Sequence, residues 1–177
     1  MYVLTAAVVL LSALCLLNIL LTVGVVKRLR EHTEILAPIR QQAGIRTGDE
    51  VGDFQTVSVD GRPLERGSLA DDSVVAFFAP DCQPCKVLLP EFVRFAEADD
   101  SGRDRRMAVV IGTPEASQDL VALLNPVAHV VVEEPLGPVG TAFRTSGTPT
   151  VLRVGTARGR TVVTSDRVLA MPAATAV

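Results

Sequence analysis

The stretch FFAPDCQPCK, residues 77–86, decides the fold of this chain. It lies where an apolar run, residues 74–78, meets a segment with a different pattern. The apolar run has no polar alternation, which is typical of a strand buried on both faces of a sheet. Over residues 83–98, apolar side chains recur at helical spacing, with charged residues on the other side. The sequence therefore predicts a buried strand that passes directly into a helix.

Two cysteines, Cys82 and Cys85, lie at this junction, three positions apart. In the first turn of a helix, unpaired backbone N–H groups and the positive end of the helix dipole favour a thiolate and lower its pKa. Cys82 is therefore the predicted nucleophile. Cys85, one turn on, is the predicted resolving thiol, which attacks the mixed disulfide and releases the substrate.

The chain gives less support to a zinc site or a purely structural disulfide at this pair. A zinc site needs about four ligands, and the remaining candidates are Cys15, in an apolar N-terminal run, and His129, at the start of a predicted strand. A purely structural disulfide across so small a loop would stabilise little. We therefore expect redox chemistry without a metal or cofactor, and His129 as a core or edge histidine. A binding module whose thiolates capture Cu(I) stays open as an alternative from another class.

The rest of residues 46–165 shows short apolar runs punctuated by Gly, Pro and Asp. This order predicts a mixed sheet covered by helices, an α/β fold. The expected elements are a strand at 54–59 ending in the turn Asp60-Gly61, a strand at 107–111, a helix capped by Thr113 and running to about 124, a strand at 130–132, a helix at 139–143, and a hairpin of 150–154 with 161–163 turning near Arg158-Gly159.

Residues 48–96 resemble the redoxin subgroup of the thioredoxin fold, specifically the membrane-anchored TlpA-like thiol-disulfide oxidoreductases. Their pattern has a Gly-x-x-x-x-Asp-Phe entry, an Asp-Gly turn, an apolar strand, Cys-x-Pro-Cys, and a Pro five residues after the second Cys. The chain has each of these in Gly48, Asp53, Phe54, Asp60, Gly61, residues 74–78, Cys82, Cys85 and Pro90. The resemblance implies a thioredoxin-like fold, with a mixed central sheet flanked by helices, over roughly residues 46–165.

The segment Gly147-Thr148-Pro149-Thr150 is similar to the family's cis-proline loop, which packs beside the cysteine pair and offers backbone to the substrate chain. The resemblance thus implies that Thr148 and Pro149 bind substrate. We place Gln83 and Pro84, between the cysteines, in the same substrate-binding set.

Two residues and the tail of the chain depart from the family pattern. Asp81 stands where a Trp usually precedes the first Cys, and its carboxylate should raise the pKa of Cys82. Ala76 stands six residues before Cys82, where thioredoxin has a buried acid that assists the second Cys, so the sequence names no proton acceptor for Cys85. The chain ends in a tail at 166–177 where the family has a closing helix. We therefore expect the stalk or a partner to cover the last face of the sheet.

Length and composition allow about one domain, because the chain has 177 residues and domains take roughly 100 to 200. A net charge of −3 argues against a nucleic-acid partner. The mean hydropathy of +0.35 comes from residues 2–26, which contain no charged residue. As a helix this run would reach roughly 37 Å, enough to span a hydrocarbon core of about 30 Å.

We interpret residues 1–26 as a permanent membrane anchor, because no basic residue precedes the apolar run and no small-residue cleavage site closes it. A lipoprotein signal is disfavoured because Leu14 precedes Cys15. Residues 27–45 would form a juxtamembrane helix or stalk. The anchor and stalk also resemble the methylamine-utilisation accessory proteins of the MauD type.

Two lines of argument disagree on which side of the cytoplasmic membrane the domain lies. The basic residues Lys27, Arg28 and Arg30 favour a cytosolic flank, whereas long following domains translocate largely regardless of such charge. We place the domain on the extracytoplasmic side, because a membrane anchor followed by a redox-active cysteine pair fits a redox protein outside the cytosol. We expect a single-pass protein that exchanges disulfides with protein substrates there, served by a membrane-borne electron donor or acceptor. The narrower alternative is a dedicated maturation factor for one disulfide-containing enzyme.

Overall fold

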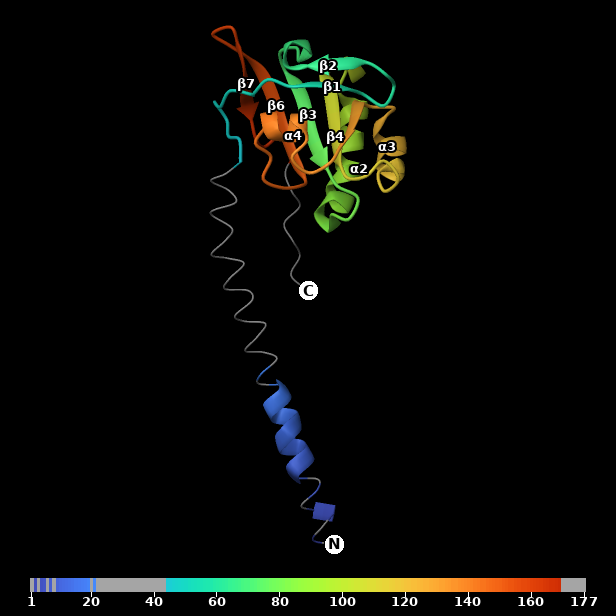
Figure 1. Ribbon diagram of the computed structural model, residues 1–177, viewed down its shortest axis with the longest axis vertical. Coiled ribbons are helices and arrows are strands. Elements are labelled where there is room, and N and C mark those ends of the chain that lie inside the picture. Colours follow the sequence, from blue (N-terminus) through green and yellow to red (C-terminus); the bar gives the residue numbers. More distant parts are fainter. Residues whose placement is uncertain are drawn as a thin grey trace. The chain divides into compact units, whose positions relative to one another are not determined.

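The computed structural model describes residues 44–169 and, near the N-terminus, residues 2, 4, 5, 7, 9–19 and 21 (Figure 1). Contacts divide the chain into two compact units, residues 1–42 and 43–177.

The described N-terminal residues are helical, and large apolar side chains such as Leu10, Leu14 and Leu17 are exposed on this unit. Within the described positions, no helix combines the length and the apolar character needed to cross a membrane. Much of the predicted anchor and stalk, including residues 22–43, lies outside the described residues, and so do residues 170–177 of the predicted tail.

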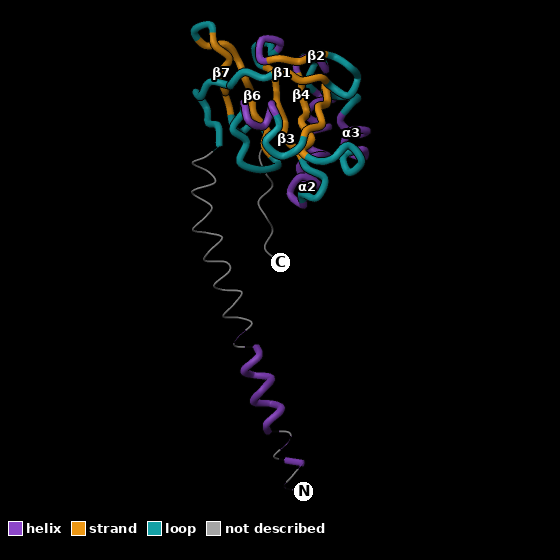
Figure 2. Tube along the Cα trace, viewed as in Figure 1, coloured by secondary structure: helices purple, strands orange, loops and turns teal. Residues whose placement is uncertain are grey.

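A five-stranded mixed sheet forms the centre of the second unit, in the order β5-β4-β3-β6-β7 (Figures 1 and 2). The first three strands in this order are parallel, and β6 and β7 join antiparallel. The strands are β3 (Ser73–Phe78), β4 (Arg106–Ile111), β5 (His129–Glu133), β6 (Thr150–Ala157) and β7 (Arg160–Ser165). The expected strands and the hairpin are therefore confirmed, with β6 and β7 longer than the sequence suggested.

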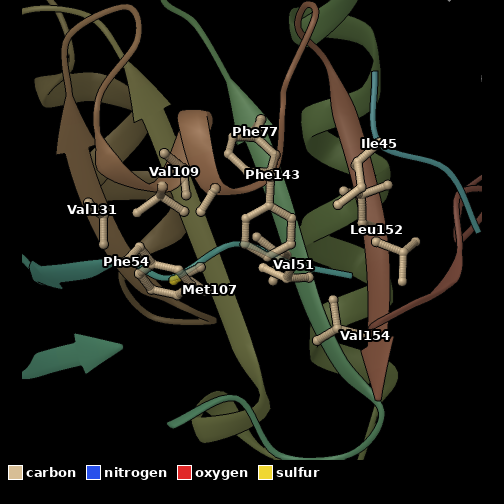
Figure 3. Packing of buried hydrophobic residues seen from close by; sticks show 14 of the residues in the cluster. Ile45, Val51, Phe54, Phe77, Met107, Val109, Val131, Phe143, Leu152 and Val154 are labelled. Atoms are coloured by element: carbon tan, nitrogen blue, oxygen red, sulfur yellow. The ribbon is translucent and has the colours of Figure 1, made fainter. Parts of the chain in front are cut away.

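All six residues of β3 are buried, as the unbroken apolar run predicts. Because side chains alternate along a strand, β3 supplies two separate cores. Val75 and Phe77 join a core on one face (Figure 3). Ala76 and Phe78 join the other, which also contains Cys85.

Helices cover both faces of this sheet. On the face that buries Phe78 lie α2 (Gln83–Ala98) and α3 (Gln118–Leu124), whereas α4 (Pro138–Ala142) packs on the face that buries Phe77. In Figure 3, Phe143, which follows α4, lies against Phe77, with ring centroids 5.5 Å apart.

The helix expected from Thr113 starts later than predicted. Thr113 does cap one turn, because its carbonyl accepts the Ser117 N–H at 3.1 Å and its hydroxyl accepts the Ala116 N–H at 3.4 Å. Regular helix begins only at Gln118.

Outside the main sheet, β1 (Gln55–Val57) and β2 (Pro63–Glu65) form an antiparallel ribbon around the predicted Asp60-Gly61 turn. Short 3-10 helices span Arg66–Ser68 and Arg103–Arg105. After β7, Val168 and Leu169 pack against the core that contains Cys85, so part of the predicted tail covers that face of the sheet.

Candidate active site

The cysteine pair lies where the sequence predicted, at the carboxyl end of β3 and the start of α2. Cys82 is the residue that caps α2, and Gln83 and Pro84 open the helix. Cys82 and Cys85 are joined by a disulfide. The pair is therefore held between a fully buried strand and a 16-residue helix, which fixes the position of both sulfurs.

The two sulfurs differ in their access to solvent. Cys85 is 2% exposed and packs in the core with Leu88 and Phe92, whereas Cys82 is half-buried. The backbone N–H of Cys85 lies 3.1 Å from both Cys82 Sγ and the Cys82 carbonyl oxygen, so this donor at the helix start is shared between the two. An incoming sulfur can therefore reach Cys82 first, and Cys85 only through it.

The loop before β6 completes the site. The peptide bond between Thr148 and Pro149 is cis, as the resemblance implied. The Thr148 carbonyl oxygen lies 3.4 Å from Cys82 Sγ, although the two residues are 66 positions apart. This contact follows from the sheet register, because Thr150, the first residue of β6, pairs with Phe77 near the end of β3.

The remaining predicted contact residues form the rim of the site. Gln83 and Pro84 are exposed beside the disulfide, and Thr148 and Pro149 are half-buried. Asp81 is exposed too, and in the described part of the chain it has neither an ion-pair nor a hydrogen-bond partner. The structure thus brings all six predicted site residues together around the disulfide, while their roles stay predictions.

No buried acid lies beneath the disulfide in the described domain. Ala76, at the position where thioredoxin has an acid, is fully buried in the Cys85 core. Across residues 44–169 the one buried carboxylate is Glu133. It is on β5, two residues after Val131, so its side chain points to the opposite face of the sheet.

Glu133 is a structural residue that the sequence analysis missed. Its carboxylate accepts the backbone N–H groups of Val139 at 3.0 Å and Gly140 at 2.7 Å, and so holds the start of α4. The available signal was an acid directly after three valines and one residue before a Pro- and Gly-rich turn. It fixes the helix that leads into the Thr148–Pro149 loop.

His129 lies apart from the disulfide, at the start of β5, and is 4% exposed. Its Nε2 lies 2.9 Å from Asp104 Oδ1, which confirms the expectation of a buried core or edge histidine. Among the described residues, no cluster of three or more His, Cys, Asp or Glu side chains is arranged to hold a metal ion.

No protein-family model matches the chain, and no curated protein matches its sequence. Solved structures do match. A thio-disulfide isomerase from Thermus thermophilus aligns with a TM-score of 0.52 at 20% identity, over 67% of this chain and 84% of that one. A secreted Mycobacterium tuberculosis disulfide oxidoreductase, described as homologous to E. coli DsbE, gives 0.53 at 19% identity, over 67% and 87%. A thiol:disulfide interchange protein from Bacteroides sp. gives 0.55 at 12% identity, over 71% and 83%.

The chain has the thioredoxin fold. This agrees with the sheet order, with helices on both faces, and with the cysteine pair at the junction of a central strand and a helix. The predicted fold class of the second unit is thereby confirmed.

Proposed function

We propose that this protein is a membrane-anchored thiol-disulfide oxidoreductase that acts on extracytoplasmic protein substrates through the Cys82/Cys85 couple. One observation carries the proposal. A half-buried Cys82 is bonded to a buried Cys85 at the start of α2, and the Thr148 carbonyl lies 3.4 Å from its sulfur. A structural disulfide would not require one accessible sulfur and one protected sulfur.

We propose a separate step for each sulfur. In the reduced protein the Cys82 thiolate attacks a substrate disulfide, forms a mixed disulfide and releases the first substrate thiol. The Cys85 thiol then loses its proton and attacks Cys82 Sγ, which releases the second substrate thiol and restores the internal disulfide. In the opposite direction, a substrate thiolate attacks Cys82 Sγ in the disulfide.

Thr148, Pro149, Gln83 and Pro84 are proposed to contact the substrate. They surround the accessible sulfur on two sides, from the loop before β6 and from the first turn of α2. The backbone of the loop can pair with an extended substrate chain, and the side chains beside it can then select among substrates.

The membrane anchor, the extracytoplasmic location and a membrane-borne electron donor or acceptor are part of the same proposal. They rest on the uncharged residues 2–26 and on the need of a redox couple for a partner that resets it.

A dedicated maturation factor of the MauD type is the narrower form of this proposal. It rests on the resemblance of the anchor and stalk, and it predicts fast exchange with one partner enzyme and slow exchange with unrelated disulfides. Exchange rates with several unrelated disulfide peptides would separate it from a general oxidoreductase.

The deciding experiment asks whether the couple is reversible. Full-length protein carrying Cys15→Ser is equilibrated in dithiothreitol redox buffers, and free thiols are counted by alkylation and mass. Fluorescence is unsuitable because the chain has no Trp. We expect the two thiols to appear and disappear together, at a potential within the span of about −270 to −120 mV known for this fold.

Two variants test the roles of the sulfurs. Cys82→Ser should abolish exchange with a disulfide peptide, whereas Cys85→Ser should accumulate a mixed disulfide that is visible as added mass. Full activity of Cys82→Ser would refute the mechanism. Thiols that bind Cu(I) tightly but never pair reversibly would favour the metal-binding alternative.

A further inference from the structure

Glu133 carries a buried carboxylate that the proposed exchange steps do not use. It is 8% exposed, at the carboxyl end of β5, and its oxygens accept the backbone N–H groups of Val139 at 3.0 Å and Gly140 at 2.7 Å. A carboxylate is costly to bury unless it is hydrogen-bonded, and hydrogen bonds to an ionised acceptor are strong. The side chain of Glu133 is therefore fixed to the first turn of α4.

Two glycines make room for this carboxylate. A side-chain carbon added at Gly137 would lie 2.6 Å from Glu133 Cδ, and one added at Gly140 would lie 3.0 Å from Glu133 Oε1. Because protein interiors are close-packed, either carbon would displace the carboxylate. The turn before α4 and the start of the helix are thus built around the Glu133 side chain.

The loop proposed to bind substrate, residues 146–149, is held at both ends. At its start, the Thr145 N–H donates at 2.9 Å to the carbonyl of Gly140, the residue whose own N–H the Glu133 carboxylate accepts. At its end, Thr150 belongs to β6, which pairs with β3. One support of the loop therefore depends on Glu133, and the other does not.

The backbone of Glu133 is tied to the segment that carries the nucleophilic sulfur. Its carbonyl oxygen accepts the Gly112 N–H at 2.9 Å. Gly112 packs against Pro80, since a side-chain carbon there would lie 3.1 Å from Pro80 Cδ. Pro80 is two residues before Cys82. Glu133 thus connects, through its backbone and its side chain, the chain segment before Cys82 with the loop whose carbonyl faces the Cys82 sulfur.

We propose that Glu133 is a positioning residue for disulfide exchange: it sets where the loop 146–149 lies relative to Cys82, and so how well a substrate chain is held there. The inference rests on the proposed oxidoreductase function and deepens it, because it names a determinant of substrate binding away from the sulfurs. Loss of the carboxylate loosens the α4 end of the loop and leaves the β6 end in place. The Thr148 carbonyl then moves relative to Cys82 Sγ, and a chain that pairs with the loop backbone is held less well.

This role separates two kinds of disulfide. A peptide disulfide has a backbone that can pair with the loop 146–149, so its reaction depends on where the loop lies. Hydroxyethyl disulfide has no peptide backbone, and it needs only access to Cys82 Sγ. A change that merely destabilised the fold would not distinguish the two.

The test measures both reactions in the same variants. Full-length protein carrying Cys15→Ser and Cys85→Ser is the parent, so that the reaction stops at the mixed disulfide whichever direction the couple runs. It is mixed with a peptide cyclised through one disulfide or with hydroxyethyl disulfide, quenched in acid and weighed. Added Glu133→Gln should lower the rate constant for the peptide about tenfold, because a misplacement of about 1 Å can cost up to about 10²-fold. The rate constant for hydroxyethyl disulfide should stay unchanged.

Gly140→Ala tests the same contact from its other partner. The added carbon would displace the Glu133 carboxylate without removing its charge, so the peptide rate constant should fall again. Gly67→Ala is the matched control, because a carbon there would lie 3.5 Å from Glu65 Oε1, an ordinary van der Waals distance. It should change neither rate constant.

Met107→Ala separates positioning from stability. Met107 is 3% exposed in the core that also contains Phe143, near the start of β4 and away from the carboxyl ends of the strands. Its truncation should destabilise the domain at least as much as Glu133→Gln, and it should leave the ratio of the two rate constants unchanged.

Two results would overturn the proposal. In the first, Glu133→Gln leaves the ratio of the peptide to the hydroxyethyl disulfide rate constant as it is in the parent. In the second, Met107→Ala lowers that ratio as much as Glu133→Gln does. Either result leaves the proposed function intact, whereas a parent that forms no mixed disulfide with either probe contradicts the function and the inference with it.

Discussion

Replacing Glu133 by glutamine tests how the start of α4 is held. The Glu133 carboxylate is 8% exposed and accepts two backbone N–H groups, from Val139 at 3.0 Å and from Gly140 at 2.7 Å. Glutamine has nearly the same shape, but its amide nitrogen cannot accept a hydrogen bond. One N–H therefore loses its acceptor while buried, and the other loses the charge of its acceptor.

The size of the effect follows from these two bonds. A hydrogen bond to a charged group contributes about 1.5–3 kcal/mol, and a buried donor without a partner costs about 1–3 kcal/mol. We expect Glu133→Gln to lower the free energy of unfolding by about 2 kcal/mol. For a domain of this size that corresponds to about 8 °C in melting temperature. Glu133→Ala removes both acceptor oxygens and should lower the free energy of unfolding further.

The assay is urea denaturation of the full-length protein followed by far-ultraviolet circular dichroism. The control is Glu134→Gln, the same chemical change at the next residue, which is exposed. An exposed substitution of this kind should stay within about 0.5 kcal/mol of the wild type. Equal unfolding free energies for the two glutamine variants would refute the reasoning, because the carboxylate would then not hold α4.

Two further predictions concern stability. Hydrogen bonds from Ser58 and Arg103 lower the pKa of Asp60 to about 2 from its ordinary 3.8. The contribution of its carboxylate to the free energy of unfolding is therefore complete above about pH 4 and is lost as the pH falls toward 2. The urea midpoint of Asp60→Asn should therefore fall less between about pH 5 and pH 2.5 than that of the wild type, and an equal fall would contradict this. Phe92 is 0% exposed, so Phe92→Ala should lower the free energy of unfolding by about 3–5 kcal/mol in the same urea assay. The control Val87→Ala, on the same helix but 55% exposed, should cost far less, and equal losses would contradict the assignment of Phe92 to the core.

Elements with a strong local pattern were predictable from the sequence. The buried run of β3 and the amphipathic pattern of α2 placed the junction, and with it Cys82 and Cys85, within one residue of the observed bounds. Such patterns are local, since the repeat of a strand or helix is visible within a few residues. Where the local signal was only a cap, as at Thr113, the turn formed but the regular helix started at Gln118.

The site itself was only partly predictable. Spacing and junction context identified the sulfurs, and the resemblance added the Thr148–Pro149 loop. Which atoms of that loop approach Cys82 could not be read from the chain, because the contact spans 66 positions and depends on the pairing of β6 with β3. The capping of α4 by Glu133 depends in the same way on how β5 and α4 pack.

By itself, the sequence determined the order of the main-sheet strands and the helices between them, the position of the cysteine pair at a helix start, and the absence of charge over residues 2–26, but not strand β2. Only the tertiary structure decided how far each sulfur is exposed, that a carbonyl lies against Cys82 Sγ, and that no other acid of the described domain takes the place of Ala76 beneath the disulfide. The physical reason is that the spacing of apolar residues in a strand or helix depends only on residues that are close in the sequence. Burial, register and side-chain partners arise only when distant segments pack together.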